Sequence, residues 1–133
     1  MGNILKISEA ASLGLHAMAI MAKNPQKLVS VKEISETLKV SPNHLSKVLQ
    51  RLVKAELVLS IKGFGGGFKL AKKPEEVNFL EIYEAIDGRF KPSVCLLNKP
   101  DCKHTCIMGG FLKSINTQVE DFFNNTKLTD LIK

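Results

Sequence analysis

The amino-acid sequence predicts a mostly α-helical protein with one small β-hairpin and a long C-terminal helix. Three observations predict this fold class. Apolar residues recur at three- and four-residue spacings, a glycine-rich turn separates two short β-prone segments, and capping residues precede several of the helical stretches. The length of 133 residues corresponds to about one domain, and a content of 44% hydrophobic and 24% charged residues is typical of a globular protein.

The first helix is expected from Ile4 to about Ala22, because Asn24-Pro25 is a helix-ending signal. Its apolar positions repeat with helical spacing and are Ile7, Ala11, Gly14, Leu15, Met18 and Met21. A capping box over 30–33 then predicts a second, short helix: the Ser30 hydroxyl can accept from the Glu33 amide, and the Glu33 side chain can reach back.

A third helix is predicted to begin at Ser41-Pro42, an N-cap serine followed by proline at the first helical position. Its inward stripe consists of Leu45, Val48, Leu49, Leu52 and Val53. Its opposite face is polar and basic and consists of Asn43, His44, Ser46, Lys47, Gln50, Arg51 and Lys54. Two short helices joined by a tight turn, the second basic on its outer face, are typical of a helix-turn-helix.

A β-hairpin is expected directly after this helix, with strands at 57–61 and 68–70 and a glycine-rich turn at 62–67. The turn lacks the Gly-Lys-Ser/Thr ending of a phosphate-binding loop, and no helix opens after it, so a nucleotide site is rejected. A hairpin in this position is a wing, and the predicted architecture is therefore a winged helix-turn-helix.

The chain changes character after Pro74, which divides it into a predicted DNA-binding domain at 1–75 and a cysteine-loop sensor segment with a dimerisation helix at 76–133. A fourth helix is predicted between Asn78, as N-cap, and Gly88. From about Met108 a further helix has an apolar stripe made of Phe111, Leu112, Ile115, Val119, Phe122 and Phe123. The first four helices and the hairpin already provide the core of a winged-helix domain. This late apolar stripe is therefore expected to face a second subunit, which predicts a homodimer.

The charge is distributed unevenly along the chain. Residues 1–73 contain twelve Lys/Arg and four Asp/Glu, a net of +8, whereas residues 74–133 contain seven and nine, a net of −2. A basic front half suits a polyanion such as DNA. No segment is long and apolar enough to span a membrane, and no secretory signal is recognised, so a cytoplasmic protein is expected.

Three cysteines, Cys95, Cys102 and Cys106, lie within twelve residues of one another. Their odd number and a reducing compartment argue against a disulfide framework and favour a metal or redox role. Only His104 lies near them, without an orienting carboxylate or a substrate-pocket motif, so an enzyme is not expected.

Taken together, SVKEISETLKVSPNHLSKVLQRLVKAELV, the wing IKGFGGGFKLA, the three cysteines and the ending FFNNTKLTDL resemble the Rrf2 family of bacterial winged-helix transcription regulators, which includes the IscR-like and NsrR-like proteins. The resemblance covers essentially the whole chain. It implies a dimeric DNA-binding regulator, in the first place a repressor, that binds palindromic double-stranded DNA with the helix-turn-helix in the major groove and the wing in the minor groove.

The resemblance places Ser41, Asn43, His44, Ser46 and Lys47 on the recognition helix, and Lys62, Gly63 and Phe64 at the wing tip; Arg51, from the basic face, completes the candidate DNA-binding set. Amides at the helix start can donate to a phosphate, Asn43 suits adenine and Lys47 suits guanine. Lys62 suits the negative potential of a narrow minor groove.

Three residues depart from the family pattern in and before the wing. Lys62 replaces the usual arginine and has no planar fork, and Phe64 replaces a proline. Glu56 stands where the family commonly has a glycine. If that position has positive φ, Glu56 is strained by about 1–2 kcal/mol.

Many members of the family hold a two-iron, two-sulfur cluster on three cysteines and a fourth ligand, and the resemblance implies a 2Fe-2S cluster on Cys95, Cys102 and Cys106. The histidine used by IscR-like members falls at Gly109, so the ligand must come from elsewhere. His16 on the first helix is the leading candidate, although a histidine there also fits a core position; Glu9 and His104 rank behind it, and Ser12 is a poor substitute.

Two alternatives to the cluster stay open. A tetrahedral zinc site could form from Cys95, Cys102, His104 and Cys106, but the spacing is tight for zinc and this option ranks last. A cluster-free regulator could instead respond to thiol oxidation or to the binding of a metabolic enzyme, as one member of the family does.

Overall fold

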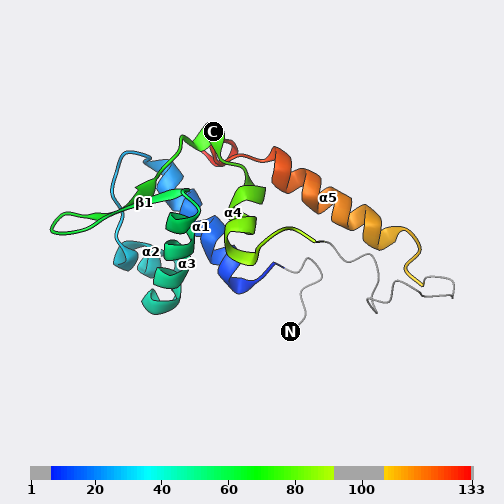
Figure 1. The fold of residues 1–133 in the computed structure, drawn as a ribbon, viewed down its shortest axis with the longest axis horizontal. Helices are drawn as coiled ribbons and strands as arrows, with labels where there is room; N and C mark the ends of the chain where they lie inside the picture. Colours follow the sequence, from blue (N-terminus) through cyan, green and yellow to red (C-terminus); the bar gives the residue numbers. More distant parts are fainter. Residues whose placement is uncertain (1–6, 92–106, 133) are drawn as a thin grey trace.

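The structure is a computed structural model that describes residues 7–91 and 107–132. The predicted fold class is confirmed: helices dominate and one two-stranded antiparallel sheet accompanies them (Figure 1). In chain order the elements are α1 (Glu9–Lys23), α2 (Val31–Leu38), α3 (Pro42–Lys54), β1 (Val58–Ile61), β2 (Gly67–Leu70), the short 3-10 helix η1 (Pro74–Glu76), α4 (Phe79–Asp87), α5 (Phe111–Asn125) and the 3-10 helix η2 (Leu128–Leu131).

The start of α1 differs from the prediction. The helix begins at Glu9, because Ser8 is its N-cap and the Ser8 hydroxyl accepts a hydrogen bond of 3.0 Å from the Ala11 amide. The same hydroxyl donates to the Asp87 carboxylate at 2.5 Å, so the first turn of α1 is tied to the end of α4. An apolar spacing that continues to Ile7 concealed this cap, and residues 4–6 lie outside the described residues.

The predicted capping residues of the later helices are confirmed. The Ser41 hydroxyl accepts from the His44 amide at 3.3 Å, the Asn78 side chain accepts from the Glu81 amide at 2.9 Å, and Gly88, with a φ of 81°, is the C-cap directly after α4. Each acceptor satisfies an amide that would otherwise lack a partner in the first helical turn. These local interactions fix where α3 and α4 begin.

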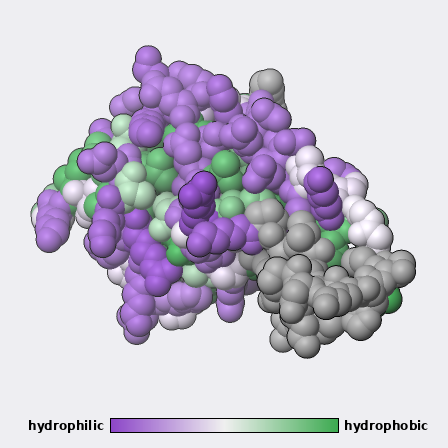
Figure 2. Space-filling model, turned by 45° about the vertical axis from the view of Figure 1, so that its right-hand side comes forward, coloured by the Kyte–Doolittle hydropathy of each residue, from purple (hydrophilic) through white to green (hydrophobic). Residues whose placement is uncertain are grey.

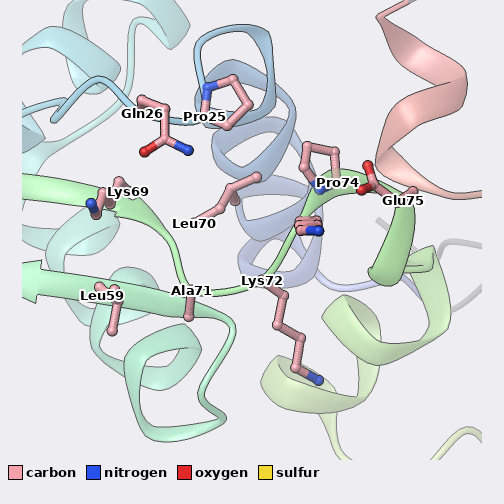
Figure 3. Close-up of a pocket in the computed structure, with 10 residues that line it drawn as sticks. Pro25, Gln26, Leu59, Lys69, Leu70, Ala71, Lys72, Pro74 and Glu75 are labelled. Carbon is pink, nitrogen blue, oxygen red and sulfur yellow. The ribbon is translucent and has the colours of Figure 1, made fainter.

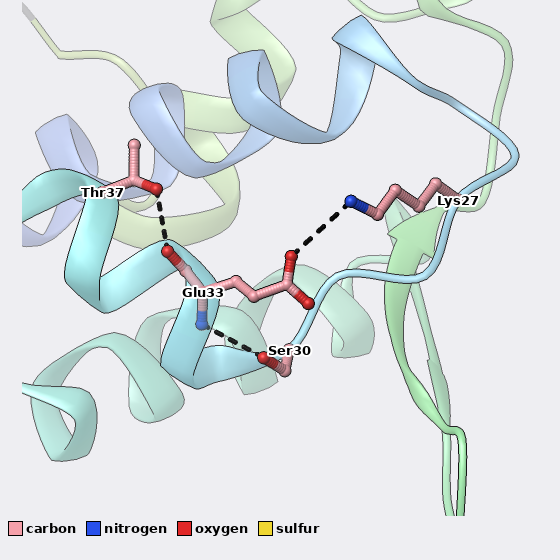
Figure 4. Close-up of polar contacts among 4 residues, drawn as sticks. All are labelled: Lys27, Ser30, Glu33 and Thr37. Atoms are coloured by element: carbon pink, nitrogen blue, oxygen red, sulfur yellow. Dashed lines mark hydrogen bonds and ion pairs between the residues drawn. The ribbon is translucent and has the colours of Figure 1, made fainter.

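The capping box of α2 forms only in part (Figure 4). The Ser30 hydroxyl accepts from the Glu33 amide at 3.1 Å, as predicted. The Glu33 carboxylate, however, lies 3.8 Å from the Lys27 Nζ. Both charged side chains are more than half exposed, so this ion pair contributes little to stability.

The hairpin is attached to the helices by a pair of backbone hydrogen bonds that the sequence does not indicate. Within the hairpin, Val58 pairs with Leu70 and Ile61 pairs with Gly67. On the other edge of β2, Val29 and Phe68 exchange two hydrogen bonds of 2.8 Å each. The segment between α1 and α2 therefore anchors β2, and the far end of the hairpin projects away from the helices (Figure 1).

One cluster of buried apolar residues extends from α1 through α3 and the hairpin to α4. Met18, Ile34, Leu45, Leu49, Leu52 and Ile82 are fully buried in it. At Gly14 an added Cβ would lie 3.2 Å from the Ile86 side chain, so the missing side chain lets α1 and α4 pack closely. This core holds α3 and the base of the wing in fixed relative positions.

The last described segment returns to the core. Leu128 is fully buried, its amide donates to the Val77 carbonyl at 3.0 Å, and the Phe79 amide donates to the Thr126 carbonyl at 3.0 Å. Phe123 is also buried and packs 5.8 Å from the Tyr83 ring. The C-terminal end of α5 is thus fixed to α4, whereas the rest of the helix extends away from the body (Figure 1).

In the described part of the chain, no helix has the length and hydrophobicity that crossing a membrane requires.

Candidate nucleic-acid interface and cysteine segment

The face of α3 opposite the core presents the predicted DNA-binding residues. Leu45, Val48, Leu49 and Leu52 are at most 2% exposed and fix the orientation of the helix. Asn43 and Lys47 are exposed on the other side, and His44 and Ser46 are half-buried. The Ser41 hydroxyl, which accepts from the His44 amide, keeps its own proton available for a ligand oxygen.

A tight turn connects α3 to the wing. The Leu57 amide donates to the Leu52 carbonyl at 3.0 Å, and the Glu56 amide donates to the Val53 carbonyl at 2.9 Å. In this turn Glu56 has a φ of 63°. A positive φ was the condition under which strain was expected at this position, where a glycine is more common. The strained residue therefore sets the angle between the helix and the hairpin.

The wing tip is exposed at each candidate position: Lys62, Gly63 and Phe64. The Gly66 amide donates to the Gly63 carbonyl at 3.0 Å and closes the turn. A Cβ added to Gly66 would lie 2.0 Å from the carbonyl oxygen of Ile61, so only glycine fits there. The glycine-rich run thus shapes a tight turn rather than a flexible loop.

Arg51 contacts α4. Its guanidinium donates a hydrogen bond of 3.0 Å to the backbone carbonyl of Ile86, in the last turn of that helix. The residue is exposed, and its remaining donors stay available to a ligand. Arg51 was predicted to bind DNA because of its charge, and it also makes this hydrogen bond within its own chain.

The end of α4 leads toward the cysteine segment and is held by polar and aromatic contacts. The Phe90 amide donates to the Glu84 carboxylate at 2.9 Å, and the Phe90 ring packs edge-on against Tyr83 at 5.6 Å. Burial, together with the nearby Asp87 and Glu84 carboxylates, raises the pKa of Tyr83 above its ordinary value of 10.0. Tyr83 therefore stays protonated and neutral at physiological pH.

The three cysteines and His104 lie outside the described residues. Residues 7–91 and 107–132 contain no group of three or more His, Cys, Asp or Glu side chains that could hold a metal ion. Of the predicted cluster ligands, the structure thus describes His16 and the lower-ranked Glu9.

His16 lies on the exposed side of α1, which contradicts the interpretation of this histidine as a core residue. Its Nδ1 is 2.7 Å from the Ser12 carbonyl oxygen. Because a carbonyl only accepts, Nδ1 is the donor, and Nε2 is left with the lone pair that a metal would use. Glu9 is also exposed, in the first turn of the same helix.

A shallow pocket of 380 Å³ lies at the base of the wing (Figure 3). Its lining combines apolar side chains with three lysines, Lys69, Lys72 and Lys73. Lys72 lies 3.7 Å from the Glu81 carboxylate. These lysines are not among the predicted site residues, although three lysines within five positions at the end of β2 are visible in the sequence.

Hydrophilic side chains cover most of the face shown in Figure 2, with smaller hydrophobic areas between them. The large apolar residues with the greatest exposure in the described ranges are Leu59, Ile61 and Phe64 in the hairpin, and Ile107, Phe111, Phe122, Leu131 and Ile132 near or on α5 and η2. The hairpin and the C-terminal part thus hold the exposed apolar surface.

Comparisons with known proteins agree with this architecture. The Rrf2 family model, described as an iron-dependent transcriptional regulator, matches residues 7–133. The chain is 35% identical over 129 residues to an HTH-type transcriptional regulator of Aquifex aeolicus, covering 94% of this chain and 90% of that one. It is 32% identical over 107 residues to the transcriptional regulator NsrR of Bacillus subtilis, covering 79% and 73% of the two chains.

Among solved structures, CymR (YrzC), the global cysteine regulator of Bacillus subtilis, matches with a TM-score of 0.81 and 27% identity. The match covers 96% of this chain and 95% of CymR. The similarity therefore extends over both the hairpin and the C-terminal helices.

Proposed function

The chain belongs to the Rrf2 family of transcriptional regulators, and from this we propose that it is a homodimeric repressor that binds palindromic double-stranded DNA and whose DNA affinity depends on its three-cysteine segment. The observation that supports this best is the position of α3. Its apolar side is buried while Asn43 and Lys47 are exposed, and the turn at Glu56 connects it to a projecting wing. Such a helix fits the major groove, and such a hairpin fits the neighbouring minor groove.

The proposed DNA contacts fall into three kinds. Ser41 and the helix start of α3 bind a phosphate, since free amides and the helix dipole favour an anion there. Asn43 and Lys47 contact base edges, with His44, Ser46 and Arg51 beside them. Lys62, Gly63 and Phe64 enter the minor groove.

The proposed dimer uses the apolar residues of α5 that remain at least partly exposed. Phe111 and Phe122 are each 58% exposed, and Leu112, Ile115 and Val119 are half-buried on the same helix. Pairing α5 with a second copy would remove this apolar surface from water. A symmetric dimer would place two copies of α3 on the two halves of a palindrome. In this proposal, residues 1–75 bind DNA and residues 76–133 sense and dimerise.

The proposed cofactor is a 2Fe-2S cluster held by Cys95, Cys102 and Cys106 with His16 as fourth ligand. Three thiolates and one imidazole are a donor set that iron–sulfur clusters accept, and the His16 tautomer leaves Nε2 for a metal. When bound, the cluster supplies a redox-active centre. The chain's own contribution is the orientation of the His16 ring by the Ser12 carbonyl.

Anaerobic purification followed by iron and acid-labile sulfide analysis tests the cofactor. We expect near-stoichiometric iron and sulfide, with a visible absorption band that disappears in Cys102→Ala. The matched variant His16→Ala should keep iron but shift the spectrum, because only one of four ligands changes. Protein that stays colourless and iron-free after anaerobic reconstitution would refute the cluster.

The match to CymR favours a second candidate in which no cluster is present and DNA affinity depends on thiol oxidation or on a bound metabolic enzyme. Mass spectrometry of peroxide-treated protein distinguishes the two. A disulfide or sulfenic acid on Cys95, Cys102 or Cys106 that changes DNA affinity in iron-free protein supports the second candidate.

Genomic DNA selection with the purified chain tests the DNA-binding function itself. We expect enrichment of a palindromic sequence that is footprinted on both half-sites. Recovery of no specific duplex under either loaded or cluster-free conditions would refute it.

A further inference from the structure

Phe64 is the most exposed large apolar residue in the described ranges, with a relative exposure of 111%. Burial within its own chain therefore contributes nothing to keeping a phenylalanine at this position. The exposed apolar residues of β1 have a smaller exposed fraction: Ile61 is 43% exposed and Leu59 is 46% exposed. Phe64 lies in the turn between β1 and β2, and this hairpin projects from the body (Figure 1).

The shape of the turn does not require an aromatic ring either. The hydrogen bond from the Gly66 amide to the Gly63 carbonyl defines a four-residue turn with Phe64 in its second position. Gly65, in the third position, has a φ of +79°, which is the geometry of a type II turn. Most residues suit the second position of such a turn, and proline is common there. The conformation of the turn is therefore set by the glycines.

The charged residues of the wing are all basic, with Lys62 near the ring in the sequence and the other lysines toward the base of the wing. Between Glu56 and Glu75 the sequence has no acidic residue and has four lysines, Lys62, Lys69, Lys72 and Lys73. A protein surface suited to an exposed phenylalanine would be apolar and would not need this charge. A nucleic acid provides both of the matching features, a polyanionic backbone for the lysines and stacked bases for the ring.

We propose that Phe64 is a wedge that enters a base-pair step from the minor groove, partly unstacks it and kinks the operator. Apolar side chains that enter the minor groove in this way bend the duplex by about 20–90° toward the major groove. The wing would then select flexible pyrimidine–purine steps at the position of Phe64, without a hydrogen bond to any base. The inference rests on the proposed DNA-binding function and assigns a separate role to this one residue.

The experiment uses the full chain and a 30-base-pair duplex selected by that chain, with dyes at both ends for bending and 2-aminopurine placed at successive steps. We expect the wild-type protein to shorten the dye-to-dye distance and to raise 2-aminopurine fluorescence at one step per half-site. Phe64→Ala keeps the turn, since most residues suit its second position, and should remove both signals and weaken binding about 5- to 30-fold. Phe64→Leu, another apolar wedge, should keep part of both.

Lys62→Ala is the matched control, because it removes a neighbouring charge and leaves the ring. It should weaken binding and reduce its salt dependence while the fluorescence signal at saturation persists. The unfolding midpoints of all three variants should equal that of the wild type, since both side chains are exposed.

Two results would overturn the wedge alone: specific binding by the wild type with silent 2-aminopurine at every step, or unchanged bending and fluorescence in Phe64→Ala. A wild-type chain that selects no duplex at all would overturn the proposed function and the wedge with it. The two failures are therefore distinguishable.

Discussion

The guanidinium of Arg51 in α3 donates a hydrogen bond of 3.0 Å to the backbone carbonyl oxygen of Ile86 in the last turn of α4. The two residues are 35 positions apart in the sequence. The chain reaches the cysteine segment only a few residues after α4 ends at Asp87. The contact therefore connects the helix proposed to bind DNA with the element that leads to the proposed sensor.

Arg51→Ala should lower the free energy of unfolding by about 1 kcal/mol, because the Ile86 carbonyl loses a charge-assisted hydrogen bond at a partly buried position. Urea denaturation measures the change. Arg89→Ala removes the same side chain from an exposed position just beyond α4 and should change stability by less than about 0.5 kcal/mol. Equal losses in the two variants would show that the hydrogen bond has no special effect.

Glu56→Gly should stabilise the protein by about 0.5–1 kcal/mol. Glu56 has a φ of 63°, a conformation that disfavours residues with a Cβ, and glycine relieves this strain at the cost of a more flexible unfolded chain. Glu56→Gln keeps the strain and removes the charge, so it should show no such gain. Urea midpoints of the wild type and the two variants distinguish relief of strain from loss of charge. A gain in Glu56→Gln equal to that in Glu56→Gly would assign the stabilisation to the charge.

Gly66→Ala should disrupt the wing while the helical core stays folded. The new Cβ would lie 2.0 Å from the Ile61 carbonyl oxygen, which is backbone and cannot move without opening the hairpin. We expect normal far-ultraviolet circular dichroism, faster amide exchange in β1 and β2, and at least about tenfold weaker DNA binding. Gly110→Ala, where an added Cβ meets nothing within 4 Å, is the control. Wild-type exchange rates in the hairpin of Gly66→Ala would contradict the argument.

Lys47→Glu should weaken operator binding by at least about 30-fold, because an exposed cation on the outer face of α3 becomes an anion facing DNA. The proposed dimer should stay intact in this variant, which sedimentation can check. Lys113→Glu makes the same charge change at an exposed position of α5 and should reduce affinity less than about fivefold. Unchanged binding by Lys47→Glu would refute the proposed orientation of α3.

The parts of the fold that depend on local chemistry were predictable from the sequence. Ser41, Asn78 and Gly88 mark helix ends in the structure as they did in the sequence, since a cap involves only residues within one turn. The position of the wing followed from its glycines. The start of α1 was wrong by several residues, because the apolar spacing continues past the Ser8 cap.

Contacts between distant segments could not be predicted in this way. Val29 lies between the turn after α1 and the N-cap of α2, and nothing in its neighbourhood indicates a pairing with Phe68. The same holds for Arg51 and Ile86. The orientation of the His16 ring depends on the Ser12 carbonyl, which becomes a partner only once the helix has formed. In the candidate site, residue types could be predicted from the sequence, whereas their partners depended on the tertiary structure.

The attachment of α5 at one end has a mechanical consequence. With Phe123 and Leu128 buried against the core and Phe111 exposed, the helix is a lever whose fixed point is its C-terminal end. At 1.5 Å per residue the arm from Phe123 to Phe111 is about 18 Å long, so a rotation of about 10° at the fixed point moves the far end by about 3 Å. That far end follows directly on the cysteine segment. Under the proposed function, a change in the cysteine segment therefore reaches α5 at the end farthest from its attachment, where the least force is needed to turn the helix.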